Sequence, residues 1–150
     1  MLLPAVLKNI ATLGFIGYLP LAPGTFASLA AFLFFLSLKP SFPAQVSLLI
    51  VFVIAGTAAA DCAEKILGEK DSRHIVIDEF AGYMLSVLFL PRTIPCFFAA
   101  FLLFRFFDIL KPPPIKWIEK NLPGGVAIVA DDLMAGIYVN ALLRLWILLA

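Results

Sequence analysis

The sequence contains few charged residues: 14% of its 150 residues are Asp, Glu, Lys or Arg, against about a quarter in an ordinary soluble domain. Eleven basic residues against ten acidic ones leave a net charge of +1, which excludes a nucleic-acid-binding protein of the basic-patch kind. Two cysteines cannot form the disulfide framework of a small secreted domain. Because 63% of the residues are hydrophobic, the chain is not disordered. A small membrane protein or an unusually apolar soluble helical domain remains, and the length allows a single domain, residues 1–150.

The hydrophobic residues form five blocks, separated by proline-rich breaks where helices are expected to end. The blocks are residues 26–38, 44–60, 80–90, 93–104 and 133–149. A helix that crosses a bilayer needs about 20 mostly apolar residues, and the second and fifth blocks come close to that length. The others span only if their helices include polar flanking residues. The first block would then begin near Thr25, the third would begin near Asp78, and the fourth would continue to about Ile109. We predict an all-α, multi-pass helical membrane protein with about five helices, some short or partly immersed; a soluble helical core is the alternative.

Two other segments carry weaker signals. Residues 2–13 are amphipathic and are expected to lie in the membrane interface. They have no basic leader and no clear cleavage site, so they are not expected to be a secretory signal. Residues 73–77 are the only candidate for a β-strand.

All ten acidic residues fall on one side when the five helices are threaded alternately through a bilayer. Eight of the eleven basic residues fall on the same side: Lys8, Lys65, Lys70, Arg73, Arg105, Lys111, Lys116 and Lys120. Since short basic loops stay in the cytoplasm, we expect this face, and a site on it, to be cytoplasmic. Solvated loops alone explain exposed charges, but they explain poorly the carboxylates at boundaries of apolar blocks, where burial is costly.

Six carboxylates at these boundaries are candidate ligands of a cation: Asp61, Asp78, Glu79, Asp108, Asp131 and Asp132. The single histidine and the positions of the two cysteines argue against a zinc site of the His/Cys type. Oxygen ligands suit Mg²⁺, Mn²⁺ or Ca²⁺, and Mg²⁺ typically takes one or two carboxylates together with phosphate oxygens and water. For the adjacent pairs Asp78-Glu79 and Asp131-Asp132, helix capping is the alternative.

A second group of polar residues follows the fourth block. Arg105, Asp108 and Lys111 recur at i, i+3 and i+6, so on a helix they form one polar stripe on an otherwise apolar surface. Arginine binds phosphate as a fork and lysine as a point charge. A self-contained Arg105–Asp108 salt bridge at a helix end is the alternative.

Two glycine-containing segments could also approach an anion. Residues 23–28 predict a turn into a helix N-terminus with Thr25 as a candidate N-cap, where free N–H groups and the Thr25 and Ser28 hydroxyls could bind phosphate. Gly124-Gly125 precede the fifth block and either let the backbone approach a ligand closely or form an ordinary turn.

Missing residues exclude several phosphatase chemistries. There is no second histidine for a His-nucleophile enzyme, and Gly68 and Leu102 stand where a Cys-nucleophile loop needs arginine. There is no Asp-x-Asp motif and no glycine-rich nucleotide loop. Metal-assisted phosphoryl transfer with water as the nucleophile remains.

Four motifs in a fixed order carry a resemblance to a known family. They are Pro20-x-x-Pro23-Gly24-Thr25-x-x-Ser28, Ile75-Val76-Ile77-Asp78-Glu79-Phe80-x-Gly82, Phe104-Arg105-x-x-Asp108-x-x-Lys111-Pro112-x-Pro114-Ile115 and Gly124-Gly125-x-x-Ile128-x-x-Asp131-Asp132-x-x-x-Gly136. Over roughly residues 14–140 the sequence resembles the bacterial phosphatidylglycerophosphatase A family. It departs from the usual pattern at Ala27, where glycine is common, and at Ser72, where proline often follows the residue matched by Asp71.

The resemblance implies an all-helical, Mg²⁺-dependent phosphatase of the bacterial cytoplasmic membrane that converts phosphatidylglycerophosphate to phosphatidylglycerol and inorganic phosphate. It implies membrane lipids as surroundings, but no nucleic acid and no protein partner. By motif position, the functional residues are Asp78, Glu79, Arg105, Asp108, Lys111, Asp131 and Asp132, with Thr25 and Ser28 behind them.

The resulting hypothesis assigns a role to each residue. Asp78, Glu79, Asp131 and Asp132 hold Mg²⁺, with Asp61 as a possible outer ligand, while Arg105 and Lys111 bind the phosphate. Asp108 either ligates the metal or orients the attacking water. A phospholipid-synthesising transferase and a membrane cation transporter are the alternatives from other classes; the transferase's Asp-rich motif is absent, and the carboxylates lie at helix ends rather than at mid-membrane.

Overall fold

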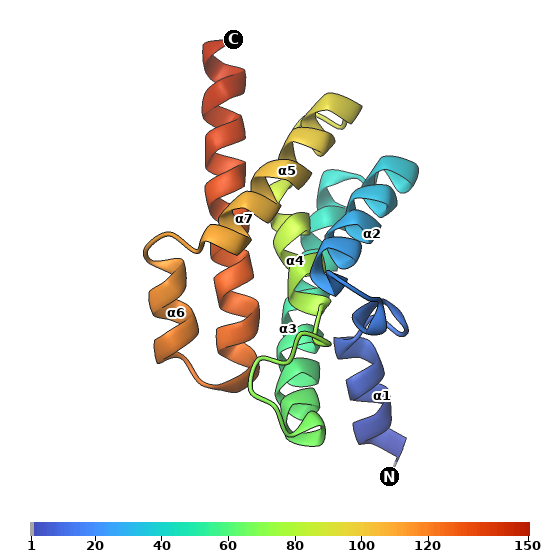
Figure 1. The fold of residues 1–150 in the computed structure, drawn as a ribbon. Helices are drawn as coiled ribbons and strands as arrows, with labels where there is room; N and C mark the ends of the chain where they lie inside the picture. Colours follow the sequence, from blue (N-terminus) through green and yellow to red (C-terminus); the bar gives the residue numbers. More distant parts are fainter. Residues whose placement is uncertain (1) are drawn as a thin grey trace.

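A computed structural model of the chain describes residues 2–150, and within that range every regular element is helical (Figure 1). The elements are α1 (Leu2–Ala11), the 3₁₀ helix η1 (Ile16–Tyr18), α2 (Pro23–Leu38), α3 (Phe42–Leu67), α4 (Ile77–Ser86), α5 (Ile94–Leu110), α6 (Ile115–Asn121) and α7 (Gly124–Leu149). This confirms the all-α prediction.

The five hydrophobic blocks correspond to α2, α3, α4, α5 and α7, and two helices add to them. α1 covers most of the amphipathic N-terminal stretch, and α6 follows the prolines after α5. The expected strand at residues 73–77 is wrong: these residues form a turn and the start of α4. The Val76 amide donates to the Ala11 carbonyl at 2.9 Å, so this turn is anchored to the end of α1 without any sheet.

Two helix starts differ from the sequence expectation. α2 begins at Pro23 with Ala22 as N-cap, so the expected capping role of Thr25 is wrong. α7 begins at Gly124, about two turns before Asp131, so Asp131 and Asp132 are not helix caps. Gly124 and Gly125 are therefore the first residues of α7 instead of a separate turn, and side chains there would collide with α3 at Asp61.

α3 and α7, of 26 residues each, are long and apolar enough to cross a membrane. α2 and α5 are also apolar but shorter, and α4, with ten residues, is too short to cross. In Figure 1 α2 and α5 rise above the centre of the molecule, whereas α1, α6 and the end of α3 lie below it. The first turns of α2 and α4 and the last turn of α5 lie near mid-height in this view.

The core surrounds α4, which packs against α2, α3, α5 and α7. Tyr83 of α4 is fully buried among aromatic side chains, including Phe35 and Phe97. Where α4 meets α7, two glycines allow backbone contact: a Cβ on Gly82 would lie 2.7 Å from the Asp132 carbonyl oxygen, and one on Gly136 would lie 2.5 Å from the Gly82 carbonyl oxygen. This close approach brings Asp132 beside the first turn of α4.

Candidate active site

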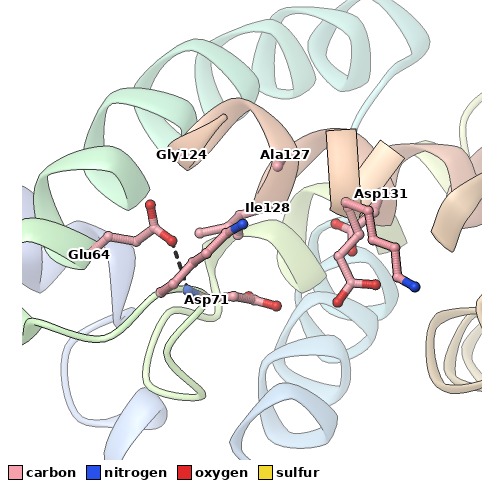
Figure 2. Close-up of a pocket in the computed structure, with 9 residues that line it drawn as sticks. Glu64, Asp71, Gly124, Ala127, Ile128 and Asp131 are labelled. Atoms are coloured by element: carbon pink, nitrogen blue, oxygen red, sulfur yellow. Dashed lines mark hydrogen bonds between the residues drawn. The ribbon is translucent and has the colours of Figure 1, made fainter. Parts of the chain in front are cut away.

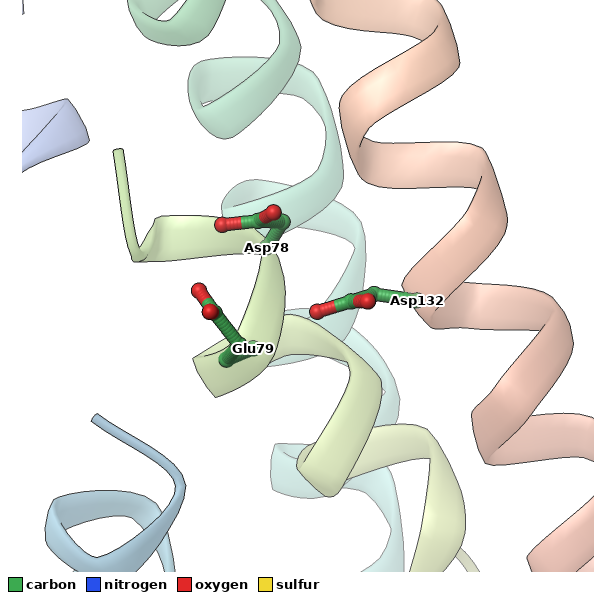
Figure 3. A group of neighbouring side chains, drawn as sticks. All are labelled: Asp78, Glu79 and Asp132. Carbon is green, nitrogen blue, oxygen red and sulfur yellow. The ribbon is translucent and has the colours of Figure 1, made fainter. Parts of the chain in front are cut away.

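Three carboxylates from two helices meet at mid-height in the bundle: Asp78 and Glu79 in the first turn of α4, and Asp132 of α7 (Figure 3). One carboxylate oxygen from each lies within 4.8 Å of the others. Asp78 and Asp132 are 7% and 3% exposed. We name these residues the carboxylate trio. The structure thus joins three of the predicted metal ligands, across 53 residues of sequence between Glu79 and Asp132.

The trio lacks the partners that buried acids normally have. Asp78 Oδ1, Glu79 Oε2 and Asp132 Oδ2 are buried and have no hydrogen-bond partner in the protein. Burial raises the pKa of Asp78, and the nearby Glu79 carboxylate raises it further. Burial also raises the pKa of Glu79 to about 7. A divalent cation would remove both penalties, because it supplies positive charge and accepts oxygen ligands, so the donor set fits Mg²⁺.

The local sequence explains how α4 presents its acids. Ile75 and Ile77 are buried against α1 and α3 and anchor the start of the helix. Acidic residues in a first turn interact favourably with the helix dipole, but no side-chain capping bond forms at this end. Glu79 reaches the first turn of α2 at Gly24, where any Cβ would overlap its carboxylate. Gly24, the glycine of the first sequence motif, therefore leaves room for the Glu79 carboxylate.

Arg105 and Asp108 lie next to the trio at the end of α5. Arg105 Nη1 is 2.8 Å from Asp108 Oδ2 and donates to Ser28 Oγ at 3.3 Å. The salt bridge that was the alternative reading therefore forms, but Arg105 Nε remains buried without a partner. The Asp108 charge contributes to the raised pKa of both Asp78 and Glu79.

Lys111 points toward a different acid. It ends α5 in the left-handed conformation, and its Nζ lies 2.7 Å from Asp131 Oδ2 and 3.4 Å from Glu119 Oε1. Burial opposes the charge on Lys111, but the hydrogen bond to Asp131 prevails and raises the pKa of the amine. Asp131 is thus paired with Lys111 and is not a member of the trio, although the adjacent residue, Asp132, is. Sequence reasoning missed Glu119, because nothing in the sequence relates α6 to Lys111.

The two remaining predicted site residues, Asp61 and Thr25, are not members of the trio. Asp61 pairs with Lys65 at 2.6 Å on an exposed part of α3. Thr25 is half-buried in the first turn of α2, one residue after Gly24. The metal-binding roles of Asp61 and Asp131 and the phosphate-binding role of Thr25 stay predictions.

A polar cavity of about 310 Å³ opens beside the site on the side of α6 (Figure 2). Its lining combines four acids and two lysines with the uncharged first turns of α7: Glu64, Asp71, Glu119, Asp131, Lys70, Lys120, Gly124, Ala127 and Ile128. The Asp71 amide donates to Glu64 Oε1 at 2.7 Å, which ties the loop after α3 to that helix. Asp131 lines the cavity, and Asp132, the next residue of α7, belongs to the trio, so the cavity lies one residue away from the carboxylates.

Comparison with known proteins decides the family. The sequence model of the family described as Phosphatidylglycerophosphatase A matches residues 9–147. The chain belongs to this family. It is therefore a phosphatase, a phosphoric monoester hydrolase, as the motifs predicted.

Individual relatives agree with the family. Phosphatidylglycerophosphatase A of Escherichia coli is 37% identical over 81% of this chain and 72% of its own length. The Haemophilus influenzae protein of the same name is 35% identical over 78% of this chain and 74% of its own. A Bacteroides thetaiotaomicron protein, provisionally named a phosphatidylinositol-3-phosphatase, is 36% identical over 90% of both chains. No solved structure matches the chain.

Proposed function

We propose that this phosphatase hydrolyses phosphatidylglycerophosphate to phosphatidylglycerol and inorganic phosphate in a Mg²⁺-dependent reaction at the cytoplasmic face of a bacterial inner membrane. The observation that carries the proposal is the carboxylate trio: two buried acids and the half-buried Glu79, each with a buried unpartnered oxygen, next to the half-buried Arg105 with its unpartnered Nε. The names of the two phosphatidylglycerophosphatase relatives support the choice of substrate.

Asp78, Glu79 and Asp132 would hold the Mg²⁺, and Asp131 and Asp61 remain candidates for outer positions. When bound, Mg²⁺ neutralises the charge of a phosphomonoester and stabilises the additional charge of the transition state. The trio is buried among packed helices, so its geometry is set before substrate binds.

Arg105 and Lys111 bind the phosphate oxygens. Arg105 is positioned by Asp108 and Ser28, which leaves Nε free to donate to the substrate. Lys111 exchanges part of its contact with Asp131 and Glu119 for a phosphate oxygen. The Ser28 hydroxyl donates to the Gly24 carbonyl at 2.9 Å, so it fixes the first turn of α2, where Thr25 adds a second hydroxyl.

Asp108 orients the attacking water. Its Oδ2 is engaged by Arg105, which leaves the other carboxylate oxygen available to a water. A water that donates a hydrogen bond to the free Asp108 oxygen would be oriented for attack on a phosphorus bound by Arg105, and attack requires that water to lie in line with the leaving oxygen. Water reaches it from the cavity next to Asp131.

The basic residues at the polar end of the bundle support a cytoplasmic site. Lys8, Lys65, Lys70 and Lys120 belong to α1, the end of α3, the following loop and α6, which together form the end below the trio in Figure 1. Short basic segments are retained in the cytoplasm. Under this orientation α3 and α7 cross the membrane, and the substrate meets the site at the level of the lipid headgroups.

Purified protein in detergent micelles should release phosphate from dioleoyl phosphatidylglycerophosphate with Mg²⁺, and at least about a hundredfold more slowly with excess EDTA. A parallel reaction with phosphatidylinositol 3-phosphate tests the substrate suggested by the Bacteroides relative. Faster release from the inositol lipid would contradict the proposed substrate. Release that EDTA leaves unchanged would contradict the metal requirement, and no release from phosphatidylglycerophosphate would contradict the proposed substrate.

A further inference from the structure

An apolar surface runs along the two helices that carry Ser28 and Arg105. It consists of Phe26, Leu29 and Leu33 on α2 and Phe98, Leu102 and Phe106 on α5, with exposed fractions from 36% at Leu29 to 54% at Phe106. We name these six residues the α2–α5 face. Such exposure of large apolar side chains marks a surface that meets lipid or another apolar partner.

α2 and α5 pack against each other in opposite directions. Three contacts define the packing: the Phe35 and Phe97 rings at 6.2 Å, the Phe32 and Phe101 rings at 6.2 Å, and Arg105 Nη1 to Ser28 Oγ at 3.3 Å. Residue numbers fall along α2 as they rise along α5, so the helices are antiparallel. The Arg105–Ser28 contact belongs to the candidate active site. The Phe32–Phe101 contact lies farther along the helices, and the Phe35–Phe97 contact lies farther still.

The exposed residues of both helices point to the same side of this pair. Leu29 directly follows Ser28, and Leu102 and Phe106 directly follow Phe101 and Arg105. Successive residues in an α-helix are rotated by about 100°. In a pair of antiparallel helices, the residue that follows an interface residue points to the same side of the pair on both helices. The exposed residues of α2 and α5 therefore form one surface.

The length and ends of this surface suit a lipid. No charged residue lies between Thr25 and Leu38 of α2 or between Ile94 and Phe104 of α5. The uncharged stretch of α2 is about 20 Å long, enough for the roughly 15 Å of hydrocarbon in one leaflet. At its lower end are Arg105, with its unpartnered Nε, and Ser28. A cation at the end of an apolar surface complements an anionic headgroup with apolar tails.

Other apolar side chains are exposed on α3 and α7. The exposed row Ile50 and Ile54 on α3 leads toward Asp61, whose carboxylate is paired with Lys65. On α7 the exposed apolar side chains are Ile137 and Leu142 as well as Trp146, which lies about 20 Å along the helix from Asp132.

We propose that the α2–α5 face receives the acyl chains of a diacyl lipid substrate, so that its phosphomonoester reaches Arg105 laterally from the membrane. This inference rests on the proposed lipid phosphatase function. It assigns the polar cavity beside Asp131 to water and released phosphate, and the opposite approach, along α2 and α5, to the lipid.

Photolabelling tests where the chains lie. The probe is a phosphatidylglycerophosphate that carries a diazirine on one acyl chain, and adducts are mapped by mass spectrometry with and without excess unlabelled substrate. We expect competable adducts on the peptides that contain Leu29, Leu33, Leu102 and Phe106. Competable adducts confined to α3 or α7, or adducts that unlabelled substrate does not reduce, would overturn the proposal. Release of phosphate from the probe in the dark tests the underlying phosphatase function separately.

A pair of double variants provides the kinetic test. L29A/F106A should lower kcat/KM at least about threefold for a dioleoyl substrate, because dispersion contacts to the chains are lost. The same variant should leave a substrate with two four-carbon chains unaffected. I50A/I54A, which removes two still more exposed apolar side chains from α3, is the control and should match the wild type on both substrates. Equal losses in both double variants, or equal losses on both substrates, would contradict the assignment.

Discussion

Asp132→Asn should lower the rate of phosphate release by about a thousandfold, which would be the largest effect of any conservative substitution in this chain. Asparagine keeps the shape of the side chain and one carbonyl oxygen but removes the negative charge that a cation requires. Asp132 is 3% exposed and its Oδ2 has no partner in the protein, so solvent cannot compensate. The measurement is phosphate release from the lipid substrate at saturating Mg²⁺.

The same variant should remain folded, and without metal it should unfold at the same or a higher temperature than the wild type. Asp132 is one of three acids crowded within 4.8 Å, and neutralising one of them relieves repulsion in the metal-free protein. Asp61→Asn is the matched control, because Asp61 lies on an exposed part of α3 with Lys65 as its partner. An inactive Asp132→Asn that is also unfolded would make Asp132 structural, and an inactive Asp61→Asn would give Asp61 the ligand role predicted from sequence.

Gly82→Ala should cause the second largest loss, although residue 82 has no functional group. Its new Cβ would meet the Asp132 carbonyl oxygen at 2.7 Å and the Phe104 ring at 2.6 Å. Since backbone cannot move away as a side-chain tip can, α7 must shift relative to α4 and Asp132 must leave its position in the trio. A misplacement of about 1 Å costs roughly a hundredfold in rate. Overpacking of this kind destabilises by about 1–3 kcal/mol.

The control for this change is Gly56→Ala in α3. There the new Cβ would meet the Ile77 side chain at 3.2 Å, which can yield by a small adjustment. We expect activity and unfolding temperature close to those of the wild type for Gly56→Ala, and losses of both for Gly82→Ala. Similar behaviour of the two variants would show that the α4–α7 contact does not set the geometry of the trio.

The positions of the main helices followed from the sequence because apolar blocks and prolines are local signals. Pro23 and Pro95 lie in the first turns of α2 and α5, as helix-starting prolines should. The start of α7 was not recognised, since a Gly-Gly pair favours a turn by its intrinsic propensity. Packing against Asp61 of α3 overrides that propensity, and this contact is tertiary.

The residue types of the site were also predictable, whereas their pairing was not. Paired acids at the boundary of an apolar block predicted ligands, and Asp78, Glu79 and Asp132 do converge. The sequence treated Asp131 and Asp132 alike, but their side chains diverge from α7: Asp132 joins the trio and Asp131 holds Lys111. Which of two adjacent acids faces the trio depends on the rotation of α7 against α4, and the contact between Gly82 and Gly136 determines it.

The most direct test of the carboxylate trio is the binding of Mn²⁺, as a paramagnetic substitute for Mg²⁺, to the purified protein followed by electron paramagnetic resonance. We expect saturable binding to the wild type that Mg²⁺ competes away, and a loss of affinity of at least about a hundredfold in both Asp78→Asn and Asp132→Asn. Wild-type affinity in these two variants would contradict the assignment of the cation to this cluster, whatever the activity of the enzyme.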